Sequence, residues 1–284
     1  MFRRMKTAEI VTSVAALHAH VSDWRRSGAR VGLVPTMGAL HAGHLSLVDT
    51  IRTRTDKAIV SIFVNPAQFA PHEDFDRYPR TLETDTAKLG DSADLIFAPP
   101  VSEMYPAGFA TRIEVGGPSQ GLETDFRPHF FSGVATVVSK LLIAAMPDVA
   151  IFGEKDYQQL LVIRRMTADL GLPIEIAGAP IVREADGLAM SSRNAYLDPK
   201  ERTIAPVLYR VLRECAARIA SGEAIARVIA EGWNEIEAAG FAVDYLEARD
   251  AETLARAETL ADRPLRLLVA ARLGKTRLID NAAV

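Results

Sequence analysis

Cysteine is almost missing from this chain. Its 284 residues include only one, Cys215, so no disulfide can form within the molecule, and the cytoplasm is the expected compartment. Long apolar runs are missing too, so no segment is expected to span a membrane. The basic start, Met1–Thr7, is followed by a short, interrupted apolar stretch that lacks the core of a signal peptide.

Neither sign of charge dominates. The net charge is −3, and nothing favours nucleic acid or an anionic membrane as a partner. Three common motifs are also absent. There is no Gly-x-x-x-x-Gly-Lys-Ser/Thr phosphate loop, Val115-Gly-Gly-Pro is a poor match to a dinucleotide fingerprint, and no cysteine–histidine spacing fits a structural zinc site. What remains is a well-packed chain of one large or two medium domains.

The most informative stretch runs from Val31 to His44 and reads Val-Gly-Leu-Val-Pro-Thr-Met-Gly-Ala-Leu-His-Ala-Gly-His. Its apolar start predicts a buried strand, and the pattern from Gly43 onward predicts a helix. His41 and His44 are three residues apart and would share one helical face. The unpaired amides of a first helical turn and the helix dipole favour an anion at this point. Two histidines and two glycines at the carboxyl end of a strand therefore indicate a ligand site.

Strand and helix patterns alternate along the first 180 residues. Strands are expected at 31–34, 57–64, 94–98, 148–152 and 174–177, and helices at 7–26, 43–55, 81–89, 134–146 and 157–170. This alternation predicts an α/β fold with a doubly wound parallel sheet and right-handed crossovers. The stretch 101–131 is rich in glycine and proline and is expected to be a long irregular loop, which is usually a functional feature.

The alternation ends near Pro180. Two helices are expected after it, at 199–220 and 225–239, followed by strands at 242–248, 265–272 and 276–280. This part of the chain predicts a second, smaller α+β domain. We therefore place the domains at residues 1–180 and 181–284.

Four polar clusters follow predicted strands or the segments after them. They are His41 with His44; Asn65 with Gln68; Gly153, Glu154, Lys155 and Asp156 with Gln158 and Gln159; and Met190, Ser191, Ser192, Arg193 and Asn194. Because the carboxyl ends of parallel strands lie along one rim, the clusters predict one shared cleft between the domains. Each cluster taken alone also fits a simpler explanation, as a strand-ending turn, an exposed helix start or a helix cap.

The side chains in these clusters suit phosphate. Lys155 and Arg193 supply positive charge, and arginine can bind an anion through two N–H groups at once. The serines beside Arg193 can donate hydrogen bonds to phosphate oxygens. Gln68 and Gln159 are neutral amides, which can orient a hydroxyl or carboxylate group of a substrate without the charge that would make a carboxylate less nucleophilic.

With these segments in view, the chain closely resembles the pantothenate synthetase (pantoate–β-alanine ligase) family, nearly from end to end. The resemblance is carried by Pro35-Thr-Met-Gly-Ala-Leu-His-Ala-Gly-His44, Phe63-Val-Asn-Pro-Ala-Gln-Phe69, Tyr78-Pro-Arg-Thr81, Phe152-Gly-Glu-Lys-Asp-Tyr-Gln-Gln159 and Met190-Ser-Ser-Arg-Asn194. The His-x-Gly-His element alone is shared with the wider nucleotidyltransferase superfamily, which includes class I aminoacyl-tRNA synthetases. The full set in this order is specific.

The resemblance implies a two-step ligation. ATP and pantoate would give pantoyl adenylate and pyrophosphate, and β-alanine would then attack the acyl carbon to give pantothenate and AMP, with Mg²⁺ accompanying the phosphates. It also implies a cytoplasmic homodimer. The domain of residues 1–180 would be a Rossmann-like nucleotide- and pantoate-binding domain, and the domain of residues 181–284 would close over the site as a lid.

The resemblance also implies roles for individual residues. His44 would be the proton donor, and His41, Lys155 and Arg193 would assist catalysis. ATP would contact Met37, Gly38, Ala39, Leu40, His41, Ala42, Gly43, His44, Gly153, Glu154, Lys155, Asp156, Val182, Met190, Ser191, Ser192 and Arg193. Gln68 would contact pantoate and β-alanine, Gln159 would contact pantoate, and Asn65 belongs to the same substrate site. Asp85 would belong to the magnesium shell.

One segment departs from the family pattern. The family usually has Arg-Pro-Gly-His-Phe-Arg-Gly-Val before the long helix, where this chain has Arg127-Pro-His-Phe-Phe-Ser-Gly-Val134. Two other functions stay open: another adenylate-forming or nucleotidyl-transferring enzyme of the superfamily, and a non-enzymatic nucleotide-binding protein. A tRNA synthetase would need an RNA-binding face, which neither the charge nor the length supports. The complete set of two histidines, Lys155 and Arg193 favours an enzyme over a protein that only binds.

Overall fold

The computed structural model describes residues 8–71, 73–259 and 263–284. The chain divides into two compact units. The first comprises the chain up to Val115 together with 127–154 and 162–179, and the second comprises 116–126, 155–161 and 180–284. The longest segment of the second unit thus starts beside the boundary expected at residue 180. Its two short segments had been assigned to the first domain on the sequence pattern.

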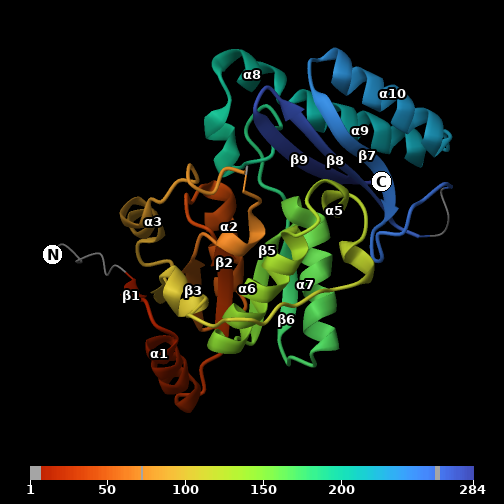
Figure 1. The fold of residues 1–284 in the computed structure, drawn as a ribbon. Coiled ribbons are helices and arrows are strands. Elements are labelled where there is room, and N and C mark those ends of the chain that lie inside the picture. The colour runs from red at the N-terminus through yellow and green to blue at the C-terminus, as the bar shows by residue number, and fades with distance from the viewer. Residues whose placement is uncertain (1–7, 72, 260–262) are drawn as a thin grey trace. The chain divides into compact units, whose positions relative to one another are not determined.

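The first unit is built on six parallel strands, in the order β1-β4-β3-β2-β5-β6 (Figure 1). Their bounds are β1 Glu9–Val11, β2 Val31–Thr36, β3 Lys57–Ile62, β4 Leu95–Phe97, β5 Val149–Gly153 and β6 Glu175–Ala179. The expected parallel α/β sheet is confirmed. The near-continuous apolar runs of the central strands fit their burial on both faces of the sheet.

Strand β1 was not predicted, because its residues were assigned to a helix at 7–26. Thr7 lies outside the described residues. Residues 9–11 pair with β4, and the helix begins only at Val14, after Ser13, whose hydroxyl accepts the Ala16 N–H at 3.2 Å. Ile10 fits the helical spacing of the apolar residues that follow, but it is an edge-strand residue with 41% of its surface exposed. The serine cap, a common helix-start signal, marked the true boundary.

Helices cover both faces of this sheet. They are α1 Val14–Arg26, α2 Ala42–Arg52, α3 Leu82–Leu89, α4 Val101–Met104, α6 Phe130–Ala145 and α7 Tyr157–Asp169, the last of which begins in the second unit. α2 packs Leu47, Val48 and Ile51 against the face of the sheet that carries Val34 and Val60. α1 and α6 contact each other and β2. α6 is apolar almost all round and almost wholly buried, as expected for a core helix.

The second unit contains a three-stranded antiparallel sheet in the order β7-β8-β9, with bounds Ala242–Asp250, Leu265–Leu273 and Thr276–Ala283. Its helices are α5 Glu123–Phe126, α8 Pro199–Ile204, α9 Val207–Ala220 and α10 Ile225–Ala238. The single helix expected at 199–220 is divided at Pro206, which cannot donate an intrahelical hydrogen bond. Cys215 lies in the core formed by α9, α10 and the sheet. The expected α+β architecture is confirmed.

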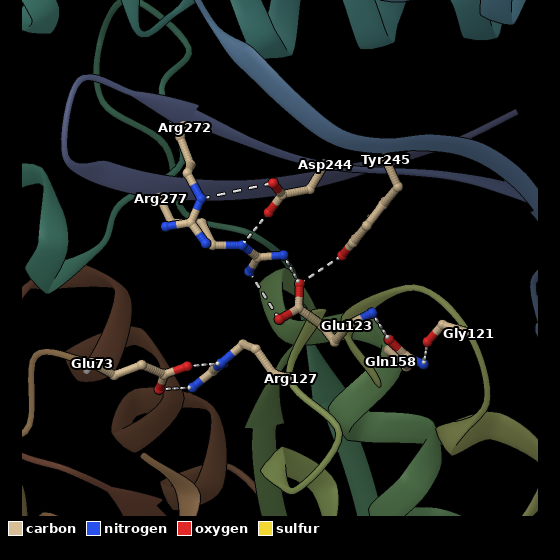
Figure 2. A network of polar contacts seen from close by, with 9 residues as sticks. All are labelled: Glu73, Gly121, Glu123, Arg127, Gln158, Asp244, Tyr245, Arg272 and Arg277. Carbon is tan, nitrogen blue, oxygen red and sulfur yellow. Dashed lines mark hydrogen bonds and ion pairs between the residues drawn. The ribbon is translucent and has the colours of Figure 1, made fainter. Parts of the chain in front are cut away.

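A buried polar network ties the segment 116–126 to this sheet (Figure 2). Glu123 accepts hydrogen bonds from the Tyr245 hydroxyl at 2.8 Å and from Arg277 Nη1 at 2.9 Å, and Arg277 Nε also donates to Asp244 at 2.6 Å. Gln158 accepts the Glu123 N–H at 3.2 Å and donates to backbone carbonyls of the same segment. Gln158, part of a predicted polar cluster, therefore serves the fold.

Among the described residues, no helix combines the length and the apolar character that crossing a membrane requires.

Candidate nucleotide and substrate site

The strand order of the first unit reverses between β2 and β5. From β2 the chain builds outward through β3 and β4, whereas β5 and β6 lie on the other side of β2. In open α/β sheets, ligands bind at the carboxyl ends of the strands at such a switch point. The segment Met37–His44 follows β2 directly, and Gly153 and Glu154 end and follow β5. Two of the predicted nucleotide segments therefore leave neighbouring strands at this point.

His41 and His44 are brought together at the start of α2. Their ring centroids lie 4.1 Å apart. His41 is the N-cap, and its Nδ1 accepts the Gly43 N–H at 3.1 Å, while His44 Nδ1 accepts the His41 N–H at 3.4 Å. Because each Nδ1 is an acceptor, each neutral ring carries its proton on Nε2. The local sequence thus fixes both rings and gives each one a defined donor atom.

The backbone amides of this turn are occupied by the protein itself. Gly38 N–H donates to Thr36 Oγ1 at 3.2 Å, and the next two amides donate to Asp85 at 2.9 and 2.8 Å. At the helix start, His44 N–H donates to the His41 carbonyl at 2.8 Å. The expectation of open amides at Gly43 and His44 is therefore wrong, because the histidine cap uses them. Phosphate could still be met here by the imidazole N–H groups.

Asn65 and Gln68 lie together where β3 ends in a single 3-10 turn, Pro66–Gln68. Asn65 is 1% exposed. Its Oδ1 accepts from Ala67 N–H at 3.3 Å and from the Tyr105 hydroxyl at 2.6 Å, and its Nδ2 donates to Gln68 Oε1 at 3.0 Å and to the Gly133 carbonyl at 3.2 Å. These four bonds use the full capacity of an asparagine amide. These contacts fix the position of Asn65, and its predicted contact with substrate stays a prediction.

Gln68 is held from two sides. Its Nε2 donates to the Met37 sulfur at 3.1 Å, which links it to the nucleotide segment after β2. The first turn of α6 packs directly on the Pro66–Gln68 turn, where a Cβ on Gly133 would lie 2.6 Å from Ala67 C and 2.8 Å from Gln68 Cα. Only glycine fits there, because those neighbours are backbone atoms. Burial also raises the pKa of Tyr105 to about 12, so this hydroxyl remains a donor to Asn65.

The segment that departs from the family pattern is anchored by Arg127. Its Nε and Nη2 each lie 2.7 Å from an oxygen of Glu73 (Figure 2), its Nη2 donates to the Gln68 carbonyl at 3.2 Å, and its guanidinium stacks 3.8 Å from the centre of the Phe130 ring. Burial acts to raise the pKa of Glu73, but the hydrogen bond and charge of Arg127 outweigh it and lower this pKa below 4.5. His129 Nε2 and Ser132 Oγ are buried without hydrogen-bond partners in the described part of the chain.

Asp85 does not face an open site. It is 0% exposed, and both of its oxygens accept backbone N–H groups of the turn after β2. Across the described ranges, no group of three or more His, Cys, Asp or Glu side chains is arranged to hold a metal ion. The geometry therefore gives no support to the predicted magnesium role of Asp85.

The remaining predicted residues belong to the second unit. The Lys155 carbonyl accepts a hydrogen bond from Asn281 at 2.9 Å, and Asp156 and Gln159 lie around the start of α7. Met190 N–H donates to the Val182 carbonyl at 3.0 Å, which closes a short hairpin. Ser191 caps the 3-10 helix Ser192–Tyr196 by accepting the Arg193 N–H at 3.3 Å, so the simpler explanation of this cluster as a cap also holds.

Residues 9–283 match the family model Pantoate-beta-alanine ligase. The pantothenate synthetase of Rhodopseudomonas palustris (strain HaA2) is 58% identical over 277 residues, which cover 97% of this chain and 98% of that protein. The crystal structure of pantothenate synthetase from Thermus thermophilus is similar with a TM-score of 0.90 and 48% identity, over 96% of this chain and 98% of that one. The pantoate-beta-alanine ligase of Francisella tularensis, solved in complex with beta-gamma ATP and beta-alanine, has a TM-score of 0.82 and 34% identity over 97% of each chain.

A doubly wound parallel sheet with two oriented imidazoles at its switch point is the arrangement expected of a nucleotide-dependent α/β enzyme. The comparisons narrow this class to one reaction. The chain belongs to the pantoate-beta-alanine ligase family. Its activity is the ATP-dependent ligation of pantoate and beta-alanine.

Proposed function

We propose that this ligation proceeds in two steps through a pantoyl adenylate. In the first step a carboxylate oxygen of pantoate attacks the α-phosphorus of ATP, and the bond to pyrophosphate breaks. In the second step the amine of β-alanine attacks the acyl carbon, AMP leaves, and the amine loses a proton. The observation that carries the proposal is the pair of imidazoles at the switch point, each with its Nδ1 held by a backbone N–H.

The role of these rings follows from where charge develops. Negative charge grows on the α-phosphate oxygens and on the departing pyrophosphate, and fixed donors aimed at that charge lower the barrier. His44 would donate from Nε2, with His41 beside it at a centroid distance of 4.1 Å. Lys155 and Arg193 would supply positive charge from the second unit. That these cations meet the histidines around one triphosphate is part of this proposal, as is the closure of the second unit over the site.

The nucleotide would be held by the segments already predicted to contact it, which are 37–44, 153–156, Val182 and 190–193. Gln68 would contact pantoate and β-alanine, and Gln159 would contact pantoate. The substrate's own carboxylate is the nucleophile, so no activated serine or cysteine is needed. Cys215 fits this account, because its burial raises the pKa of its thiol to about 11 and leaves it unreactive.

ATP and β-alanine as ligands are supported by the similarity to the Francisella protein, which was solved with beta-gamma ATP and beta-alanine. Mg²⁺ would come bound to the phosphates of ATP, where it neutralises charge. Asp85 and its neighbours do not fit a metal shell, so no step here runs through a protein-held ion. The homodimer and the cytoplasmic location implied by the resemblance remain predictions, and sedimentation of the purified protein tests the first.

The test is a pyrophosphate-release assay on the purified enzyme. ATP and pantoate together should release pyrophosphate, whereas AMP and pantothenate should accumulate only after β-alanine is added. Pyrophosphate release with a different acid and none with pantoate would favour another adenylate-forming enzyme of the superfamily. Tight ATP binding without pyrophosphate release with any acid would favour a non-enzymatic nucleotide-binding protein.

A further inference from the structure

Two side chains of α3 hold the turn that follows β2. Asp85 Oδ2 accepts the Ala39 N–H at 2.9 Å, and Asp85 Oδ1 accepts the Leu40 N–H at 2.8 Å. Lys88, one helical turn further along, donates from Nζ to the Leu40 carbonyl at 2.6 Å. One helix therefore accepts the N–H groups of two consecutive residues and donates to the carbonyl of the second.

This turn needs to be held, because its backbone is strained. Gly38 has φ +82° and Ala39 has φ +51°, and the second value is one that residues with a side chain seldom adopt. Such a conformation persists only where the surrounding structure fixes it. A carboxylate accepting two N–H groups does so well, because hydrogen bonds to a charged acceptor are roughly twice as strong as neutral ones.

The Asp85 carboxylate is itself fixed. It is fully buried, and the Thr81 hydroxyl donates to its Oδ2 at 3.1 Å. It lies in the first half of α3, where the helix dipole favours a negative charge. The space around it is also tight, since a Cβ on Gly38 would lie 3.1 Å from Asp85 Oδ2. The carboxylate is therefore held in one orientation, in which both of its oxygens face the strained turn.

We propose that Asp85 is a positioning residue, whose carboxylate clamps the backbone of residues 38–40 so that the histidine-capped start of α2 is presented to the nucleotide. This role differs from a magnesium contact, because both oxygens are already bound to backbone amides. The proposal rests on the proposed function in one respect only, which is that this turn lines the ATP site. The clamp itself is a property of the fold and can be measured without substrate.

The test compares Asp85→Asn with Glu83→Gln, an exposed carboxylate on the same helix. In D85N one oxygen becomes an NH₂ group facing a backbone N–H, so one hydrogen bond is lost. We expect kcat/KM for ATP to fall roughly 10- to 100-fold. The KM for β-alanine and the Mg²⁺ concentration for half activity should stay within about twofold. E83Q should match the wild type in all of these quantities.

Hydrogen–deuterium exchange measures directly how firmly the backbone of this turn is held. Peptides covering residues 37–44 should exchange faster in D85N than in the wild type, while E83Q should leave exchange unchanged. If D85N fails to fold, Lys88→Met carries the test, because Lys88 is exposed and its loss removes only the bond to the Leu40 carbonyl. K88M should raise the KM for ATP severalfold and speed exchange in the same peptides.

Three results would overturn the proposal: unchanged exchange at 37–44 in D85N, a D85N defect confined to the Mg²⁺ requirement, or, where D85N does not fold, wild-type behaviour of K88M. Failure of the proposed function looks different. In that case the wild type itself would release no pyrophosphate from ATP and pantoate, while the exchange measurement would still report on the clamp.

Discussion

The contact between α6 and the turn that carries Gln68 predicts the effect of Gly133→Ala. The new methyl group would lie 2.6 Å from Ala67 C and 2.8 Å from Gln68 Cα, both backbone atoms, so α6 and the turn must separate. Overpacking of this kind costs about 1–3 kcal/mol. The separation also strains the hydrogen bond from Asn65 to the Gly133 carbonyl, now 3.2 Å long, which adds about 1 kcal/mol. The thermal midpoint should therefore drop by roughly 5–10 °C.

Activity should fall as well, because Gln68 is part of the Pro66–Gln68 turn that is displaced. A misplacement of about 1 Å can cost on the order of 10²-fold in rate, so kcat/KM for pantoate should fall roughly 10- to 100-fold. Calorimetry and pyrophosphate release measure the two effects. Ser132→Ala is the matched control, since it removes a buried hydroxyl without a partner and should be neutral or stabilising. A G133A enzyme with the melting temperature and pantoate kinetics of the wild type would refute the packing argument.

Three further predictions follow from other contacts. His44→Ala should lower kcat by roughly 10²–10³-fold in the pyrophosphate assay, and a fully active variant would remove the ring from the mechanism. The pKa of Glu73 is lowered in the folded protein, so its pair with Arg127 stabilises the fold above pH 4.5 and loses this effect as the pH falls through the folded pKa. Glu73→Gln should therefore be less stable than the wild type at pH 7. The difference between their urea midpoints should close as the pH is lowered. Arg277→Met leaves buried carboxylates without their partner and should lower the free energy of urea unfolding by about 3–5 kcal/mol. Arg272→Met removes only an exposed arginine that lies 3.8 Å from Asp244, and should lower it by less than about 1 kcal/mol. Equal losses in the two variants would contradict this ranking.

The sequence predicted what is encoded locally. The histidine pair, the parallel sheet and the α+β segment after Pro180 all depend on residues close together in the chain or on a regular period. The break at Pro206 within the helix expected at 199–220 was missed, although a proline inside a helical pattern is itself a local signal. Strand β1 was missed because Ile10 matched a helical spacing, whereas its pairing partner lies in β4.

The features that the sequence did not predict depend on contacts between residues far apart in the chain. The resemblance suggested Asp85 as a metal ligand, but its partners Ala39 and Leu40 stand 46 and 45 positions earlier in the chain. Asn65 suggested a substrate contact, and its capacity is used by Tyr105 and Gly133, which no local pattern connects to it. A single sequence does not reveal which polar side chains satisfy one another across the fold.

The two short segments of the second unit bear on how this protein can be divided. Leu122 and Leu161, one from each segment, share a buried cluster with Tyr245 and Leu268. A fragment beginning at Pro180 would lose both leucines together with Glu123, and would leave Arg277 with Asp244 alone of its two acceptors. No single cut in the gene yields the second unit as an intact module, so fusions, truncations and domain exchanges in this family must carry three stretches of polypeptide together.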